Sequence, residues 1–108
     1  MKAQHLLVLC SCPGSITAKK IANELVAGNL AACVKIHPGV TSVYRWVGKV
    51  DTAEEHQLFI KTTEERYEAL EKRIKALHPY ELPEITAVPI VAGYGEYLNW
   101  IDSNTKAG

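Results

Sequence analysis

Two short stretches of the sequence hold most of its chemically reactive side chains. The first is Cys10-Ser11-Cys12, which places two thiols two positions apart. Thiolates are preferred ligands of soft metal ions such as copper, so this pair is a candidate for metal binding. A second interpretation fits equally well, because a small apolar cysteine also suits the end of a buried strand.

The second stretch, residues 78–85, reads HPYELPEI and joins two regular elements. Its prolines lack a backbone donor and restrict the residue before each of them, so the segment ends a helix and is stiffly extended. His78, Glu81 and Glu84 are of the types that perform acid–base chemistry, but a turn held by hydrogen bonds accounts for them as well. The stretch is therefore either a rigid polar surface or a helix stop in which Tyr80 serves as a packing plug.

Hydrophobic patterning predicts the elements that position these stretches. The first apolar run is expected to be a strand buried on both faces, and a run interrupted by Pro38-Gly39 is expected to continue beyond it. The predicted strands are residues 6–10, 30–36 continued through 40–49, 54–63 and 85–92, with a turn at 48–53 that closes a long hairpin. Apolar residues at helical spacing predict a helix capped by Ser15 or Thr17, a helix capped by Thr63, and a short final helix at 96–103.

The predicted order is β-α-β-β-α-β followed by a terminal helix. In one sheet this is the split βαβ, or ferredoxin-like, arrangement of the α+β class. Right-handed crossovers then place the fourth strand antiparallel beside the first, so the end of the first strand near Cys10 meets residues 78–84. A chain of 108 residues without a dividing linker is expected to form a single domain, residues 1–108.

The charge balance argues against several classes of partner. Lys and Arg number 12 and Asp and Glu number 12, and both kinds are interspersed along the chain. There is no basic face or tail, so neither nucleic acid nor an anionic membrane is expected as a partner. The apolar run at 6–10 is too short for a signal peptide or a membrane span, and an odd number of cysteines favours free thiols. We therefore expect a cytoplasmic protein.

Several motifs occur along the chain in one order. They are Leu30-Ala31-Ala32-Cys33-Val34, Pro38-Gly39, residues 42–49 (SVYRWVGK), Ile60-Lys61-Thr62-Thr63, His78-Pro79-Tyr80-Glu81 with Pro83-Glu84, and Tyr97-Leu98 with Trp100-Ile101. Together they closely resemble the CutA family, the divalent-cation-tolerance proteins, over nearly the whole chain. The resemblance implies a ferredoxin-like subunit, a tight homotrimer related in architecture to the PII signalling proteins, copper(II) binding, and a role in the response to divalent metal ions.

The resemblance also implies a particular copper site. The family's proposed ligands are a cysteine that ends the first strand and a pair of histidines before Pro-Tyr. Cys10 matches that cysteine and His78 matches the second histidine, whereas Leu77 stands where the first histidine is expected. The implied metal ligands are therefore Cys10 and His78, and a third would come from Cys12, Glu81, water or another subunit.

A trimer is also expected on physical grounds. Tyr44, Trp46 and Phe59 lie on a hairpin that extends beyond a small core, and Tyr97 and Trp100 lie on a short terminal helix. In a monomer these side chains leave apolar area exposed, unless they fold back onto their own subunit. A closed ring of hairpins would cover both this area and the free strand edges.

The sequence thus predicts a homotrimer that binds copper(II) and is not an enzyme, since no known catalytic or phosphate-binding pattern is present. The alternative is a PII-like sensor that binds a small anion or a partner protein in a cleft between subunits, lined by Arg45, Lys61, Tyr80, Glu81 and Glu84. A copper(I) metallochaperone fits poorly, because the first loop lacks the Met-x-Cys-x-x-Cys pattern. The histidines outside the motif are expected to face solvent: His5, His37 and His56.

Overall fold

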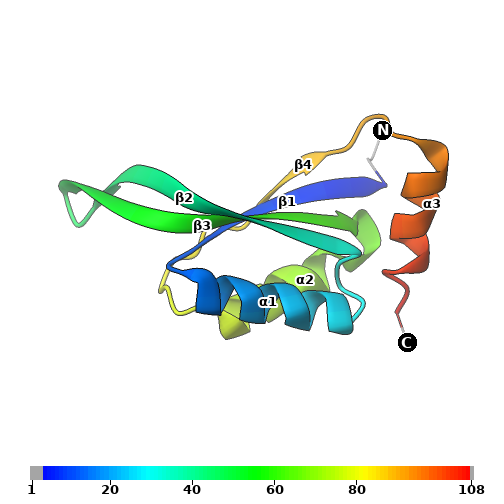
Figure 1. Ribbon diagram of the computed structural model, residues 1–108, viewed down its shortest axis with the longest axis horizontal. Helices are drawn as coiled ribbons and strands as arrows, with labels where there is room; N and C mark the ends of the chain where they lie inside the picture. Colours follow the sequence, from blue (N-terminus) through cyan, green and yellow to red (C-terminus); the bar gives the residue numbers. More distant parts are fainter. Residues whose placement is uncertain (1–3, 108) are drawn as a thin grey trace.

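The computed structural model describes residues 4–107 and confirms the ferredoxin-like α+β arrangement (Figure 1). The elements are β1 (His5–Cys12), α1 (Ser15–Ala27), β2 (Cys33–Trp46), β3 (Lys49–Thr63), α2 (Glu64–Leu77), β4 (Thr86–Pro89) and α3 (Gly95–Ser103). The strands form one sheet in the order β2-β3-β1-β4, and every neighbouring pair is antiparallel. In this topology the crossovers place β1 and β4 side by side, as predicted.

The core lies between the sheet and the layer formed by α1 and α2 (Figure 1). Val8, Leu58 and Ile60 are fully buried on the helix side of the sheet and pack with Ile21 and Ile74 of the two helices. Successive strand residues face opposite sides, so the intervening residues lie on the face that the helices do not cover. Residues 6–10 were expected to be buried on both faces, but Leu7 and Leu9 are only partly buried.

The hairpin of β2 and β3 extends well beyond the helices and gives the subunit dimensions of 44 × 27 × 22 Å (Figure 1). Strand β2 continues past Pro38-Gly39, as predicted, with a register shift between His37 and Val40. The predicted turn at 48–53 is wrong, because β3 begins at Lys49. The β-branched residues after the turn pair with β2, and only Val47 and Gly48 connect the two strands.

The predicted element ends need further correction. Helix α1 begins at Ser15 with Gly14 in the N-cap position, so neither Ser15 nor Thr17 caps it, and Thr63 makes no side-chain cap bond to α2. Strand β2 begins at Cys33 rather than at residue 30. The backbone N–H groups of residues 30 and 31 instead donate hydrogen bonds to the Leu25 carbonyl at the end of α1. Strand β4 has four residues because only residues 6–9 of β1 pair with it.

Helix α3 lies at one end of the sheet and is fastened to the first strand (Figure 1). His5 Nε2 lies 2.9 Å from Asp102 Oδ1, and the His5 side chain is buried. The prediction that His5 faces solvent is therefore wrong. Within residues 4–107, the helices are all too short or too polar to cross a membrane.

Candidate metal centre and adjoining cavity

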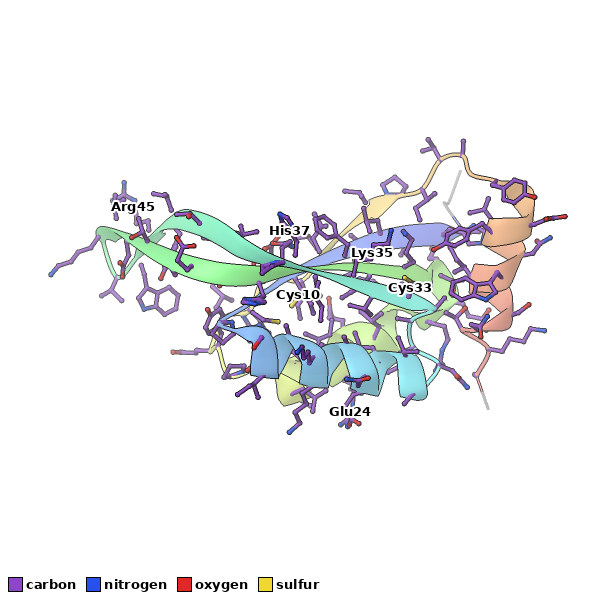
Figure 2. All side chains as sticks on the ribbon, in the orientation of Figure 1. Cys10, Glu24, Cys33, Lys35, His37 and Arg45 are labelled. Carbon is purple, nitrogen blue, oxygen red and sulfur yellow. The ribbon has the colours of Figure 1, made fainter. Side chains whose placement is uncertain are left out.

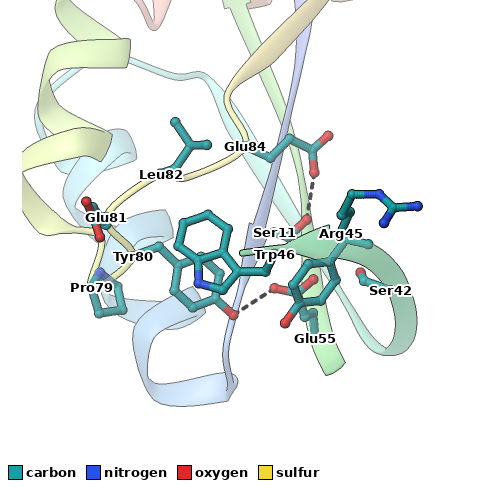
Figure 3. Close-up of a pocket in the computed structure, with 11 residues that line it drawn as sticks. Ser11, Ser42, Arg45, Trp46, Glu55, Pro79, Tyr80, Glu81, Leu82 and Glu84 are labelled. Carbon is teal, nitrogen blue, oxygen red and sulfur yellow. Dashed lines mark hydrogen bonds between the residues drawn. The ribbon is translucent and has the colours of Figure 1, made fainter. Parts of the chain in front are cut away.

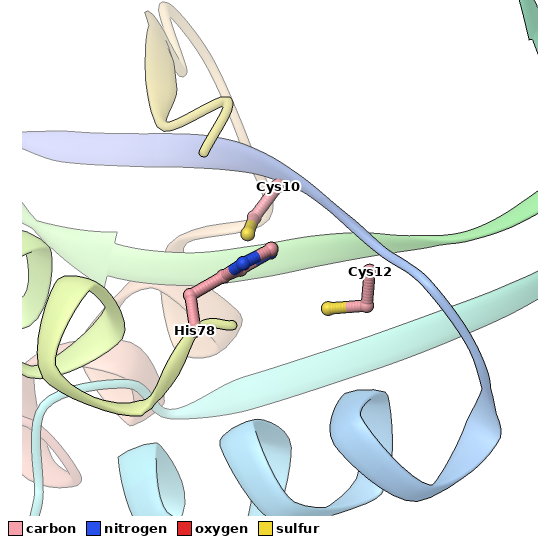
Figure 4. A group of neighbouring side chains, drawn as sticks. All are labelled: Cys10, Cys12 and His78. Carbon is pink, nitrogen blue, oxygen red and sulfur yellow. The ribbon is translucent and has the colours of Figure 1, made fainter. Parts of the chain in front are cut away.

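Three side chains lie close together between the sheet and the helices (Figure 4): those of Cys10, Cys12 and His78. Their candidate ligand atoms all lie within 4.8 Å of one another, and all three residues are buried. Strand alternation points both cysteines of β1 toward the helices. Because α2 ends at Leu77 and Pro79 prevents it from continuing, the next residue, His78, leaves the helix and turns toward them. The structure therefore brings together the two predicted metal ligands and adds Cys12.

The His78 ring is held by hydrogen bonds on both nitrogens. Nε2 lies 2.7 Å from the backbone oxygen of Ser11, and Nδ1 lies 3.1 Å from the backbone nitrogen of Tyr80. A carbonyl oxygen can only accept and an amide N–H can only donate, so Nε2 carries the proton and Nδ1 is the acceptor. This neutral form of imidazole is the one that binds metal ions.

The thiols of Cys10 and Cys12 shift each other's pKa in opposite directions. In the structure the Cys10 thiol donates to the Ser11 backbone oxygen at 3.9 Å. When Cys12 ionises, a hydrogen bond from Cys10 to its thiolate lowers the pKa of Cys12. The same hydrogen bond raises the pKa of Cys10 well above its ordinary value, and burial and the negative charges of Cys12, Glu84 and Glu55 act in the same direction. Cys12 is therefore the thiol that ionises first, and a cation placed between the sulfurs would relieve the charge repulsion.

The outer side of the same strand lines a cavity of about 610 Å³ (Figure 3). Ser11 lies between the two cysteines and faces this side, where its hydroxyl donates to Glu84 Oε1 at 2.7 Å. The Tyr80 hydroxyl donates to Glu55 Oε2 at 2.8 Å. The hairpin contributes the remaining wall, including Tyr44, Arg45 and Trp46.

The cavity contains most of the residues that the sequence analysis assigned to a cleft between subunits. Of the residues proposed from the sequence, Arg45, Tyr80, Glu81 and Glu84 line it, within a single subunit. Lys61 does not, since its Nζ lies 3.4 Å from the Tyr97 hydroxyl near α3. Ser11 and Glu55 were missed by the sequence analysis. The alternation of β1 places Ser11 opposite the thiols and could have identified it.

A family model described as CutA1 divalent ion tolerance protein matches residues 6–104. The chain belongs to the CutA1 family. A relative named divalent-cation tolerance protein CutA, from Thermus thermophilus, is 50% identical over 99 residues, which cover 92% of this chain and 96% of that protein. A solved structure of the divalent cation tolerance protein from Thermus thermophilus has a TM-score of 0.93 at 48% identity and covers 94% of this chain and 99% of that chain.

CutA1 relatives are not confined to one cellular location. The protein named CutA, chloroplastic, from Arabidopsis thaliana is 42% identical over 101 residues, which cover 94% of this chain and 56% of that longer protein. The name places that relative in the chloroplast, so the cytoplasmic location expected for the present chain stays a prediction. The family and the fold predicted from the sequence are both confirmed.

Proposed function

We propose that this CutA1-family protein binds copper between Cys10, Cys12 and His78, and that this binding underlies a role in tolerance of divalent cations. The observation that carries the proposal is the convergence of two thiols and one imidazole within 4.8 Å in a buried position. The donor set fits the metal, because thiolate and imidazole ligands suit copper better than oxygen ligands do. Copper(II) is the form that we expect the cytoplasmic protein to take up, and the site is proposed to hold metal rather than to catalyse a reaction.

Cys12 is the third ligand that the sequence analysis left open. It lies on the same face of β1 as Cys10, and the hydrogen bond from Cys10 lowers its pKa. A thiol that loses its proton readily is the better metal ligand, since only the thiolate binds. Cys12 thereby compensates for Leu77, which stands where the family resemblance implies a histidine.

Metal binding at His78 requires an exchange of hydrogen bonds. Nδ1 has the available lone pair and now accepts the Tyr80 N–H, whereas Nε2–H donates to the Ser11 carbonyl. If Nδ1 binds the metal, Nε2–H can still donate to the Ser11 carbonyl and so keep the ring in place. Metal-bound histidines commonly donate their other ring N–H to a carbonyl or carboxylate in this way. The amide of Tyr80 must then find another acceptor.

We also propose that the protein is a homotrimer. Val43, Tyr97 and Trp100 are 68%, 37% and 43% exposed in the subunit, and the Tyr97 and Trp100 rings stack at 5.4 Å. Strand β2 forms one edge of the sheet, so its outer backbone groups are unpaired within the sheet. Neighbouring copies would cover both the aromatic surface and the free edge.

A calorimetric titration with copper(II) tests the metal site. We expect saturable binding of one ion per chain, lost in Cys10→Ser, Cys12→Ser and His78→Ala. Cys33→Ser is the matched control, because Cys33 pairs with Lys61 on β3 and lies outside the cluster. Thiol counts before and after the titration separate binding from metal-catalysed oxidation. Binding that survives in all three cluster variants would refute the proposed ligands.

A further inference from the structure

The cavity on the outer side of β1 contains carboxylates that lack a cationic partner. Glu55 is only 7% exposed, and its Oε1 accepts no hydrogen bond from residues 4–107, although Oε2 accepts one from Tyr80. Glu84 is exposed, with Oε1 bonded to Ser11 and Oε2 without a donor among the described residues. Neither carboxylate forms an ion pair within this part of the chain. Among the described residues every fully buried side-chain oxygen has a hydrogen-bond partner, so the free oxygen of Glu55 is reachable by solvent, as is that of the exposed Glu84. Both free oxygens can therefore accept a hydrogen bond from a ligand.

The rest of the lining is aromatic and apolar. Trp46, Tyr80 and Leu82 line the cavity (Figure 3), and Tyr44 also contributes to its wall. Aromatic faces attract organic cations through their π electrons, and this attraction adds to that of nearby carboxylates. Arg45, the single Lys or Arg among the lining residues, forms no ion pair with either carboxylate within residues 4–107.

The carboxylates and the aromatic wall favour an organic cation over a small anion or a bare metal ion. A small anion, which was part of the alternative prediction from the sequence, would face Glu55, Glu81 and Glu84 with only Arg45 to offset their charge. A bare metal ion needs several ligand atoms close together, and the only such cluster found among residues 4–107 is the group of Cys10, Cys12 and His78, outside this cavity. An ammonium or guanidinium group on an apolar body satisfies both the carboxylates and the aromatic wall. The volume of about 610 Å³ is of the size that small-molecule sites have.

We propose that this cavity is a binding site for a small organic cation, whose charged group contacts Glu55 and Glu84 and whose apolar part contacts Trp46 and Tyr80. The proposal goes beyond metal binding and does not depend on it. The cavity opens on the other side of β1 from Cys10 and Cys12, so loss of either thiol is expected to leave cation binding intact.

Titration of the intact protein with phenethylamine at neutral pH tests this site, with 3-phenylpropionate as a matched ligand of opposite charge. We expect saturable binding of the amine and none of the acid, measured by calorimetry and by Trp46 fluorescence in a Trp100→Phe background. Glu55→Gln keeps an acceptor for Tyr80 but removes the charge, and should weaken binding roughly tenfold, the typical loss for a hydrogen bond to a charged group. Glu84→Gln should do the same.

Glu54→Gln is the control, because Glu54 is the next residue on β3 and is bonded to Thr41 outside the cavity. It should bind the amine as the unmodified protein does, and so should Cys10→Ser. Should Glu55→Gln fail to fold, Glu84→Gln carries the test alone, since Glu84 is exposed. Absence of saturable amine binding, equal binding of the acid, or unchanged affinity in the folded carboxylate variants would overturn the proposal.

Discussion

At the scale of single residues, Ser11 connects the proposed metal site with the cavity. Its carbonyl oxygen accepts the Nε2–H of His78, while its hydroxyl donates to Glu84. Its neighbours in sequence, Cys10 and Cys12, point to the opposite side of β1 because side chains alternate along a strand. Three consecutive residues would therefore contribute to the two proposed sites on the two faces of the sheet.

Tyr80 gives a prediction that depends on pH. Burial, followed by the hydrogen bond to Glu55, raises its pKa above the ordinary value of 10.0. A group whose pKa is higher in the folded state stabilises the fold fully below the unfolded pKa, and this contribution is lost as the pH rises through the folded pKa. The free energy of unfolding should therefore fall above pH 10.0, and it should fall less steeply in Tyr80→Phe. Denaturant unfolding measured from neutral to alkaline pH checks this, and identical slopes for both proteins would contradict it.

At the scale of elements, the hairpin turn contains a residue in an unfavourable conformation. Val47 has a φ of 49° and Gly48 a φ of 77°, so both turn residues are left-handed. Such two-residue turns favour Asn-Gly, whereas a β-branched residue is rarely found there. The Val47 side chain is 85% exposed, so packing within the subunit does not explain it.

Replacing Val47 by Asn should therefore stabilise the protein by ~1 kcal/mol, the cost of the left-handed conformation for an ordinary residue. The change should appear as a higher thermal midpoint at unchanged oligomeric state. Val50→Asn is the control, because Val50 is similarly exposed but lies in the extended strand β3, where Asn is disfavoured. A midpoint that stays the same or falls in Val47→Asn would show that the turn is not strained.

The elements also show what the sequence alone could predict. The β-α-β-β-α-β order was enough to predict that Cys10 lies near His78, because this order pairs β1 with β4, as the structure confirms. The contact between His5 and Asp102 spans 97 positions and depends on how α3 returns to β1, which periodicity does not encode. Glu55 is buried for a similar reason, since its partner Tyr80 comes from the segment after α2.

At the scale of the whole molecule, apolar surface is distributed unevenly around the subunit. Helices α1 and α2 cover one face of the sheet (Figure 1). Strand alternation places the partly buried Leu7, Leu9 and Phe59 on the other face. Arg45 marks the outer part of the hairpin, far from the helices (Figure 2). Surface of this kind is expected to be covered when copies of the chain assemble.

The proposed trimer leads to a prediction about which surfaces hold it together. Sedimentation should give a particle of three times the 11.9 kDa mass of one chain, which persists on dilution. Val43→Asp on the hairpin and Trp100→Asp on α3 should dissociate it, because each places a charge in apolar surface outside the helix layer. Ile16→Asp is the matched control, since Ile16 is 85% exposed but belongs to α1 in that layer. A particle of 11.9 kDa for the unmodified protein, or dissociation by the Ile16 change alone, would show that the hairpin and α3 are not the contact surfaces.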